Sequence, residues 1–122
     1  MRSLTILYVE DHKLLLLYVK DMLEEQGWRV ETCQDGMRAL EIIESGSLYD
    51  VLILDHGLPG MSGLELVRRA RCLTHRRRTP IIMLSASDAA RAARQAGADA
   101  FLKKPEEVNA IVKTVTSLTG VR

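Results

Sequence analysis

Side chains that could carry out chemistry stand at or just after the ends of four short apolar runs in this sequence. They are Glu10 and Asp11, Asp55, Ser85, and Lys104. Carboxylate oxygens bind hard cations, and a lysine ammonium with a hydroxyl can hold a dianionic phosphoryl group from two sides. Because the acidic groups offer only oxygen ligands, Mg²⁺ suits them better than zinc or copper. The set predicts phosphoryl transfer to a carboxylate, with a metal and the lysine neutralising the phosphoryl oxygens.

Asp55 is the first candidate for the acceptor carboxylate. The four residues before it are all apolar, as is typical of a strand buried on both faces of a parallel sheet. Such a strand delivers its last residue to the carboxyl edge of the sheet, where open α/β folds bind their ligands. A lone aspartate after a strand is more often a turn former or a helix cap, so the functional interpretation depends on the other acidic residues and on Lys104.

The elements that must position these groups alternate between strands and helices. Strands are expected at residues 4–9, 28–33, 51–54, 81–84 and 98–102. Helices are expected at residues 12–26, 36–45, 64–73, 89–96 and 106–118. Short connections between them imply right-handed βαβ units, and hence a doubly wound parallel sheet of five strands with helices on both faces. No repeat or linker interrupts the pattern, so residues 1–122 are expected to form one domain.

The first helix carries more leucines than one buried face needs. Five positions at helical spacing are expected to face the core: Leu15, Tyr18, Val19, Met22 and Leu23. Three further leucines are left over: Leu14, Leu16 and Leu17. They are either ordinary surface residues or a docking patch for a helical partner beside the acidic residues, and the sequence favours neither.

Two aspartates are expected to cap helices. Asp11 stands directly before the first helix, so we expect it to cap that helix as well as to bind metal. Asp88 is expected to cap the short helix rich in alanine and arginine that ends before Gly97.

Composition and charge exclude several classes of protein. Hydrophobic residues make up 47% of the chain and charged residues 27%, with a net charge of +1, so no global field favours nucleic acid or a membrane surface. No apolar run reaches the length of a bilayer span and no signal-peptide core begins the chain, so a cytoplasmic location is expected. The two cysteines are too few and too far apart to indicate a disulfide framework or a zinc site.

Arginines and histidines suggest further sites that the sequence disfavours. Arginines cluster between Arg68 and Arg78, but without interleaved aromatic residues or a recognition helix a solvated surface is favoured over nucleic-acid binding. His12 and His56 flank the acidic residues. Because no third nitrogen or sulfur ligand accompanies them, we do not expect them to bind metal.

Taken in order, these motifs resemble the receiver domain of two-component response regulators over essentially the whole chain. The matching motifs are the acidic pair Glu10-Asp11, the run from Asp55 to Gly63, the Ser85-Ala86 step, and the segment Phe101-x-x-Lys104-Pro105. The resemblance implies a flavodoxin-like (βα)₅ fold with the strand order 2-1-3-4-5.

The resemblance also implies a role for each matching residue. Asp55 would accept the phosphoryl group, and Ser85 would be the hydroxyl that moves to meet it. Lys104, rather than Lys103, matches the family lysine because it directly precedes Pro105. Since neighbouring strand residues alternate between faces, Lys103 is expected to point elsewhere.

The remaining assignments concern the metal and the conformational switch. Mg²⁺ would be held by Glu10, Asp11, Asp55 and the backbone carbonyl of Gly57. Phe101 would be the aromatic residue whose rotation follows the movement of the hydroxyl, although an aromatic on a last strand is more often a packing residue.

In such domains the phosphoryl donor is a phosphohistidine on a histidine kinase or a histidine phosphotransfer protein. The receiver catalyses its own phosphorylation and dephosphorylation and is not an enzyme acting on other substrates. No direct binding of nucleic acid or membrane is expected, whereas a phosphorylation-dependent dimer is compatible with the family. The sequence leaves open the output partner and the choice between a stand-alone protein and a piece of a longer regulator or hybrid kinase.

The chain departs from the family pattern after Ser85. Lys104 follows Ser85 by 19 positions (104 − 85), a few fewer than the family leads us to expect, and the link from Pro105 to the last helix is also short. We therefore expect a shortened fourth helix and an altered output face. A receiver-like binding module with altered switching is one alternative function. An aspartyl-nucleophile phosphatase is the other, and it is disfavoured because Gly57 stands where such enzymes have a second acid.

Overall fold

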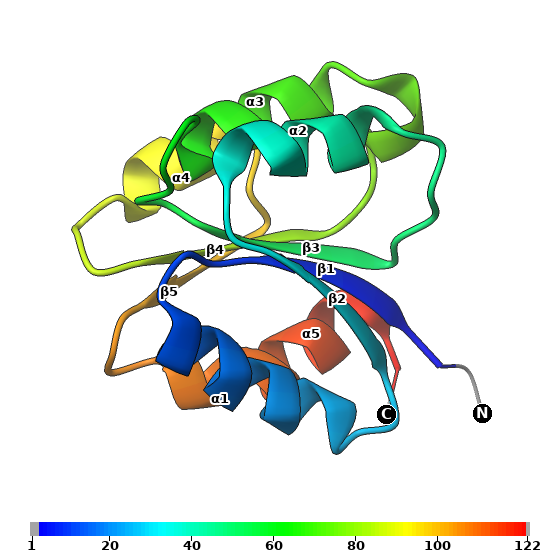
Figure 1. Cartoon of the computed structure of the whole chain (residues 1–122), viewed down its shortest axis with the longest axis vertical. Coiled ribbons are helices and arrows are strands. Elements are labelled where there is room, and N and C mark those ends of the chain that lie inside the picture. The colour runs from blue at the N-terminus through cyan, green and yellow to red at the C-terminus, as the bar shows by residue number, and fades with distance from the viewer. Residues whose placement is uncertain (1–2, 122) are drawn as a thin grey trace.

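Five parallel strands form the central layer of the computed structural model, which describes residues 3–121 (Figure 1). The strands are β1 (Thr5–Val9), β2 (Arg29–Cys33), β3 (Val51–Asp55), β4 (Ile81–Ser85) and β5 (Ala100–Lys103). Their order in the sheet is β2-β1-β3-β4-β5, and every neighbouring pair is parallel. The predicted doubly wound, flavodoxin-like sheet is confirmed.

Helices cover both faces of this sheet, so that the molecule has three layers. They are α1 (Lys13–Glu24), α2 (Gly36–Glu44), α3 (Gly63–Arg71), α4 (Ala90–Ala96) and α5 (Ile111–Thr119). In Figure 1, α1 and α5 lie below the sheet, and α2, α3 and α4 lie above it. The helix α4 has seven residues, the fewest of these five. Whether it is short relative to the family stays a prediction.

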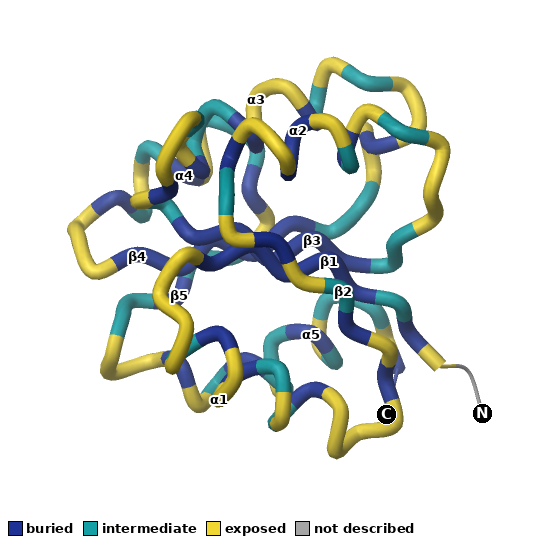
Figure 2. The backbone as a smooth tube through the Cα atoms, in the orientation of Figure 1, coloured by how far each residue is buried: buried dark blue, intermediate teal, exposed yellow. Residues whose placement is uncertain are grey.

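Two hydrophobic clusters fill the spaces between the layers. One joins the sheet to α1 and α5, and the other joins it to α2, α3 and α4. All five residues of β3 and all five of β4 are buried, including the polar residues at their ends, Asp55 and Ser85 (Figure 2). The apolar runs thus form strands buried on both faces, and each of these two strands ends in a buried polar side chain.

The buried face of α1 differs from the predicted one. Leu16, Val19 and Leu23 are buried, whereas Tyr18 is exposed and donates a hydrogen bond from its hydroxyl to Asn109 Oδ1 at 2.6 Å. The helix packs against α5 as well as against the sheet, which moves the buried line toward Leu16. Leu16 is thus a core residue, and the surface leucines are Leu14 and Leu17, which are 75% and 45% exposed.

Both predicted aspartate caps are wrong. The residue that caps α1 is His12, whose Nδ1 accepts a hydrogen bond from the backbone N–H of Leu15. The helix α4 begins after Ala89 without a side-chain cap, because the carboxylate of Asp88 instead pairs with the ammonium of Lys103. Asp11 is therefore left for the acidic cluster described below.

The last helix begins later than predicted. A 3₁₀ turn at Val108–Ala110 precedes α5. The Glu107 carboxylate accepts a hydrogen bond from the backbone N–H of Lys103 at 2.7 Å, which folds the preceding residues back onto the end of β5. The chain after Lys104 is thus a tight turn rather than the first turn of a helix.

The arginine cluster is only partly a solvated surface. Arg76 is 1% exposed, and its guanidinium donates hydrogen bonds to the backbone carbonyls of Ile43 at 2.9 Å and Ser45 at 3.1 Å. It also lies over the ring of Tyr49, 5.3 Å from the centroid. Because these carbonyls belong to the C-terminal end of α2, Arg76 ties that helix to the turn before β4.

Replacing Arg76 by alanine is therefore expected to destabilise the fold by about 2–3 kcal/mol, because it leaves a cavity and removes the guanidinium hydrogen bonds to the carbonyls of Ile43 and Ser45. Urea denaturation followed by circular dichroism measures the effect. The neighbouring Arg77 is exposed, so Arg77→Ala serves as the matched control and should change the free energy of unfolding by less than about 0.5 kcal/mol. Equal stability of the two variants would contradict the assigned role of Arg76.

Candidate functional site

The carboxyl ends of four parallel strands meet at one edge of the sheet and carry the predicted reactive groups. Asp55 is the last residue of β3, and Ser85 is the last residue of β4. Glu10 and Asp11 follow β1 directly, and Lys104 follows β5. The parallel register is what brings together these residues, which lie far apart in the sequence.

The loop after Asp55 is shaped by a close approach of two backbone segments. The backbone N–H of Gly63 donates to the carbonyl of His56 at 3.0 Å. A Cβ at position 63 would lie 2.3 Å from the carbonyl oxygen of Asp55, so only glycine fits there. Ser62 then caps α3 by accepting a hydrogen bond from the backbone N–H of Glu65. The loop therefore turns away from Asp55, whose buried side chain lies at the wall of a hollow.

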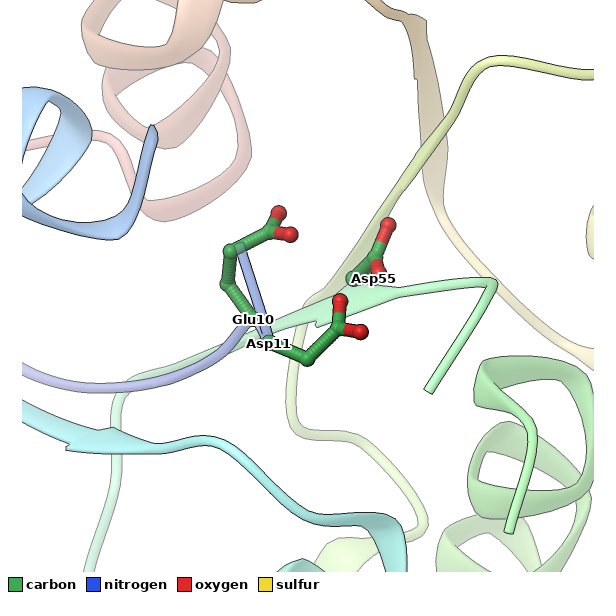
Figure 3. A group of neighbouring side chains, drawn as sticks. All are labelled: Glu10, Asp11 and Asp55. Carbon is green, nitrogen blue, oxygen red and sulfur yellow. The ribbon is translucent and has the colours of Figure 1, made fainter. Parts of the chain in front are cut away.

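Three carboxylates gather at this edge. Glu10, Asp11 and Asp55 each offer an oxygen within 4.8 Å of the others, and Figure 3 shows the carboxylates of Asp11 and Asp55 directed toward one another above the strand ends. Glu10 and Asp55 are buried, whereas Asp11 is exposed. One exposed and two buried carboxylates form an oxygen-only site that is open on one side.

Lys104 contacts two of these carboxylates. Its ammonium donates to Asp55 Oδ1 at 2.7 Å and lies 3.3 Å from Glu10 Oε1. Lys103 points away and pairs with Asp88. The placement therefore agrees with the predicted choice of Lys104 over Lys103.

Burial and mutual repulsion raise the pKa of the buried carboxyl groups. For Asp55, burial is the largest cause and raises the pKa, the hydrogen bond and charge of Lys104 lower it, and Asp11 raises it, so that the pKa is raised overall. Burial and the charge of Asp55 also raise the pKa of Glu10. Burial lowers the pKa of Lys104, but its hydrogen bond to Asp55 and the two carboxylate charges outweigh that effect, so its pKa is raised.

Among the described residues, the ion pairs of this cluster set one ammonium, that of Lys104, against Glu10 and Asp55, with the carboxylate of Asp11 close by, so acidic groups outnumber the cation. A divalent cation would remove that excess, and the available oxygen ligands suit Mg²⁺. The residues present therefore fit the metal that the sequence predicted.

Ser85 and two neighbours form a hydrogen-bonded group beside Asp55. Ser85 is 2% exposed, and its Oγ lies 2.8 Å from Ser87 Oγ and 3.2 Å from Nδ1 of His56. The sequence discounted His56 as a metal ligand and did not predict its contact with Ser85. The one available signal was its position directly after Asp55.

A hollow of about 640 Å³ opens over these groups. It is lined by Glu10, Asp11, His12, Asp55, His56, Gly57, Ser85, Ala86, Ser87 and Lys104. Gly57 thus lies at the wall where its carbonyl was predicted to act. Phe101 is absent from the wall: it is half-buried on β5 and packs against the cluster beneath α2, α3 and α4. Within residues 3–121, no helix is long and apolar enough to cross a membrane.

Comparisons with known proteins agree with this geometry. The family model described as the response regulator receiver domain matches residues 6–116. The sensory/regulatory protein RpfC of Xanthomonas campestris pv. campestris is 34% identical over 96% of this chain, which spans 17% of that protein. The chemotaxis protein CheY of Pseudomonas aeruginosa is 32% identical over 82% of this chain and 83% of its own length.

Solved structures include close matches to the whole chain. The receiver domain of the sensor histidine kinase PA1611 from Pseudomonas aeruginosa PAO1 superimposes with a TM-score of 0.87 at 30% identity, covering 98% of this chain and 99% of that domain. Its crystal structure has a magnesium ion coordinated in the active site cleft.

Proposed function

The chain belongs to the response regulator receiver domain family of two-component signalling, and from this we propose that it accepts a phosphoryl group on Asp55 in a Mg²⁺-dependent reaction and changes conformation in response. The observation that carries the proposal is the convergence of a buried, open-faced carboxylate with two further carboxylates and Lys104 at one sheet edge. A phosphohistidine of a histidine kinase or phosphotransfer protein would be the donor.

The residues of this chain divide the work of the transfer. A carboxylate oxygen of Asp55 forms the new bond to phosphorus while the bond from phosphorus to the histidine nitrogen of the donor breaks, and that nitrogen keeps the electron pair. Lys104, already 2.7 Å from Asp55 Oδ1, would hold one phosphoryl oxygen by a charge-assisted hydrogen bond. Ser85 would donate its hydroxyl to another, and Phe101 would adjust its packing afterwards.

Magnesium would be held by Glu10, Asp11, Asp55 and the backbone carbonyl of Gly57. When bound, the ion supplies positive charge that neutralises the equatorial phosphoryl oxygens. The magnesium in the cleft of the related PA1611 receiver domain supports this assignment. The domain would catalyse only its own phosphorylation and dephosphorylation and would not act as an enzyme on other substrates.

Labelling with a small acyl phosphate tests the function as a whole. With Mg²⁺ present, intact-mass spectrometry should show one added phosphoryl group per chain, and a chelator should abolish the addition. Asp11→Asn should reduce the initial rate by about tenfold or more, because it removes an exposed metal ligand from the cluster. Labelling that proceeds equally well in the chelator would contradict the metal assignment, and no labelling at all would contradict the function.

The exposed leucines of α1 support a partner surface next to this edge. Leu14 and Leu17 lie on the helix that begins beside Glu10 and Asp11, and they are among the large exposed apolar side chains of the described residues. We propose that they contact the phosphodonor protein. We also propose that the chain is cytoplasmic.

Truncation of these leucines should slow transfer from the protein donor only. Leu14→Ala and Leu17→Ala are each expected to lower the rate of transfer from a phosphohistidine protein by about fivefold, since each removes apolar contact area at a small interface. The rate with a small acyl phosphate should stay unchanged. Met37→Ala, which truncates a side chain of α2 that is 50% exposed, is the control. An unchanged protein-donor rate in both leucine variants would remove the docking role.

A further inference from the structure

Three polar atoms around Ser85 form a closed triangle at the rim of the hollow. Ser85 Oγ lies 3.2 Å from Nδ1 of His56 and 2.8 Å from Ser87 Oγ, and the third side, from Ser87 Oγ to His56 Nδ1, measures 3.4 Å. The backbone N–H of Ser87 also donates to Ser85 Oγ at 3.0 Å. The hydroxyl of Ser85 is therefore held by two neighbours on its own side of the site.

The position of the His56 ring is fixed by the sheet. Its backbone N–H donates to the carbonyl of Leu84 at 2.9 Å, which continues the pairing of β3 with β4 for one residue beyond Asp55. The ring is half-buried and forms part of the wall of the hollow. Because Leu84 directly precedes Ser85, this backbone bond keeps Nδ1 within reach of the hydroxyl.

The triangle occupies the hydrogen-bonding capacity of Ser85. A serine hydroxyl has one proton to donate, and both Nδ1 of His56 and Oγ of Ser87 lie within reach to accept it. One lone pair accepts from the N–H of Ser87, and in the other imidazole tautomer a second accepts from His56. Where the hydroxyl donates to His56 or to Ser87, it must give up that hydrogen bond before it can donate to a phosphoryl oxygen on Asp55.

We propose that His56 is a positioning residue that holds the Ser85 hydroxyl in the resting arrangement and thereby opposes the switch to the phosphorylated one. The inference rests on the proposed function, because it concerns the response of Ser85 to a group on Asp55. It assigns to His56 a role in setting how readily the domain switches, separate from metal binding. Ser87 is the second member of the same restraint.

Titration with beryllofluoride, which mimics the phosphoryl group, tests this role in the presence of Mg²⁺. His56→Leu replaces the ring by an apolar side chain of moderate size and removes Nδ1. The apparent dissociation constant of beryllofluoride should then fall by about fivefold, as expected for the loss of one neutral hydrogen bond from the resting state. His56→Asn restores an acceptor at the same branch position and should bind as the wild type does. Ser87→Ala should shift affinity in the direction of His56→Leu.

The backbone amide of Ser87 provides a readout that a purely structural role would not move. In ¹⁵N NMR spectra without beryllofluoride, His56→Leu should displace this resonance part of the way along the line that joins the free and beryllofluoride-bound wild-type positions. His75→Leu is the control, because it removes a histidine ring whose hydrogen bond is to the carbonyl of Ser45, away from Ser85. It should leave both affinity and resonance unchanged.

The outcomes distinguish a failure of the proposed restraint by His56 from a failure of the proposed function. If wild-type protein binds beryllofluoride and His56→Leu and Ser87→Ala bind it no more tightly, the restraint by His56 is overturned while the proposed function stands. If His56→Leu and His56→Asn both bind beryllofluoride more tightly than the wild type, the restraint is also overturned, since the effect then follows loss of the ring and not loss of the acceptor. If the wild type shows no response to beryllofluoride and Mg²⁺, the proposed function fails and the inference fails with it.

Discussion

Replacing Asp55 by asparagine is expected to reduce phosphoryl labelling to below about a thousandth of the wild-type level. An amide oxygen is a far weaker nucleophile than a carboxylate and cannot form a stable acyl phosphate. The change should leave the fold intact, because the amide oxygen can still accept the hydrogen bond that Lys104 donates to Asp55 Oδ1. Intact-mass spectrometry after incubation with a small acyl phosphate and Mg²⁺ measures the loss.

The stability of this variant gives an independent check. Since burial raises the pKa of Asp55, its charged form is disfavoured in the folded protein, and a neutral residue of the same shape should cost little. Asp21→Asn is the matched control, because Asp21 is an exposed residue of α1. Both variants should melt close to the wild type, and the control should label fully. Stoichiometric labelling of Asp55→Asn would place the acceptor elsewhere.

Loss of the Lys104 ammonium should have the second-largest effect. Lys104→Met keeps a side chain of similar length and should lower the initial rate of phosphoryl transfer by about a hundredfold, the usual consequence of removing one preorganised charge from the transferring group. The variant also leaves Glu10 and Asp55 without the cation that contacts both. Rates at matched Mg²⁺ concentrations, followed by incorporation of labelled phosphate, measure the change.

The adjacent lysine supplies a close control for this experiment. Lys103 precedes Lys104 directly, but its ammonium pairs with the exposed Asp88 instead of the acidic cluster. Lys103→Met should therefore keep the initial rate within about twofold of the wild type, because an exposed ion pair contributes little. An equal loss of rate in the two variants would contradict the proposal that contact with the acidic cluster gives Lys104 its role.

Much of the site could be predicted because it depends on where strands end. A continuous apolar run before Asp55 and another before Ser85 indicate buried parallel strands, and parallel strands must bring their carboxyl ends to one edge. The choice of Lys104 over Lys103 followed from alternation along β5 and from the neighbouring Pro105. The meeting of the carboxylates at one edge needed no further information than this pattern, whereas the strand order was predicted from the resemblance to the receiver domain.

The errors lie where side chains choose among nearby partners. Asp11 and Asp88 both stand where an aspartate would cap a helix, yet His12 caps α1 and Lys103 takes the carboxylate of Asp88. Local sequence identifies groups that can cap but does not show which distant cation competes for them. Arg76 was grouped with solvated arginines for the same reason, since the carbonyls that it binds lie more than 30 residues earlier in the chain.

The sequence by itself determined the fold class and the edge of the sheet at which the candidate residues meet. The reason is that hydrophobic periodicity specifies strands and helices, and parallel topology specifies where their ends lie. Only the tertiary structure decided how those groups are engaged. It showed that Lys104 bridges Asp55 and Glu10, and that His56 and Ser87 hold the hydroxyl of Ser85. The physical reason is that burial follows from the pattern of apolar residues, whereas a hydrogen bond depends on distances of a few ångströms between segments that the pattern places only approximately.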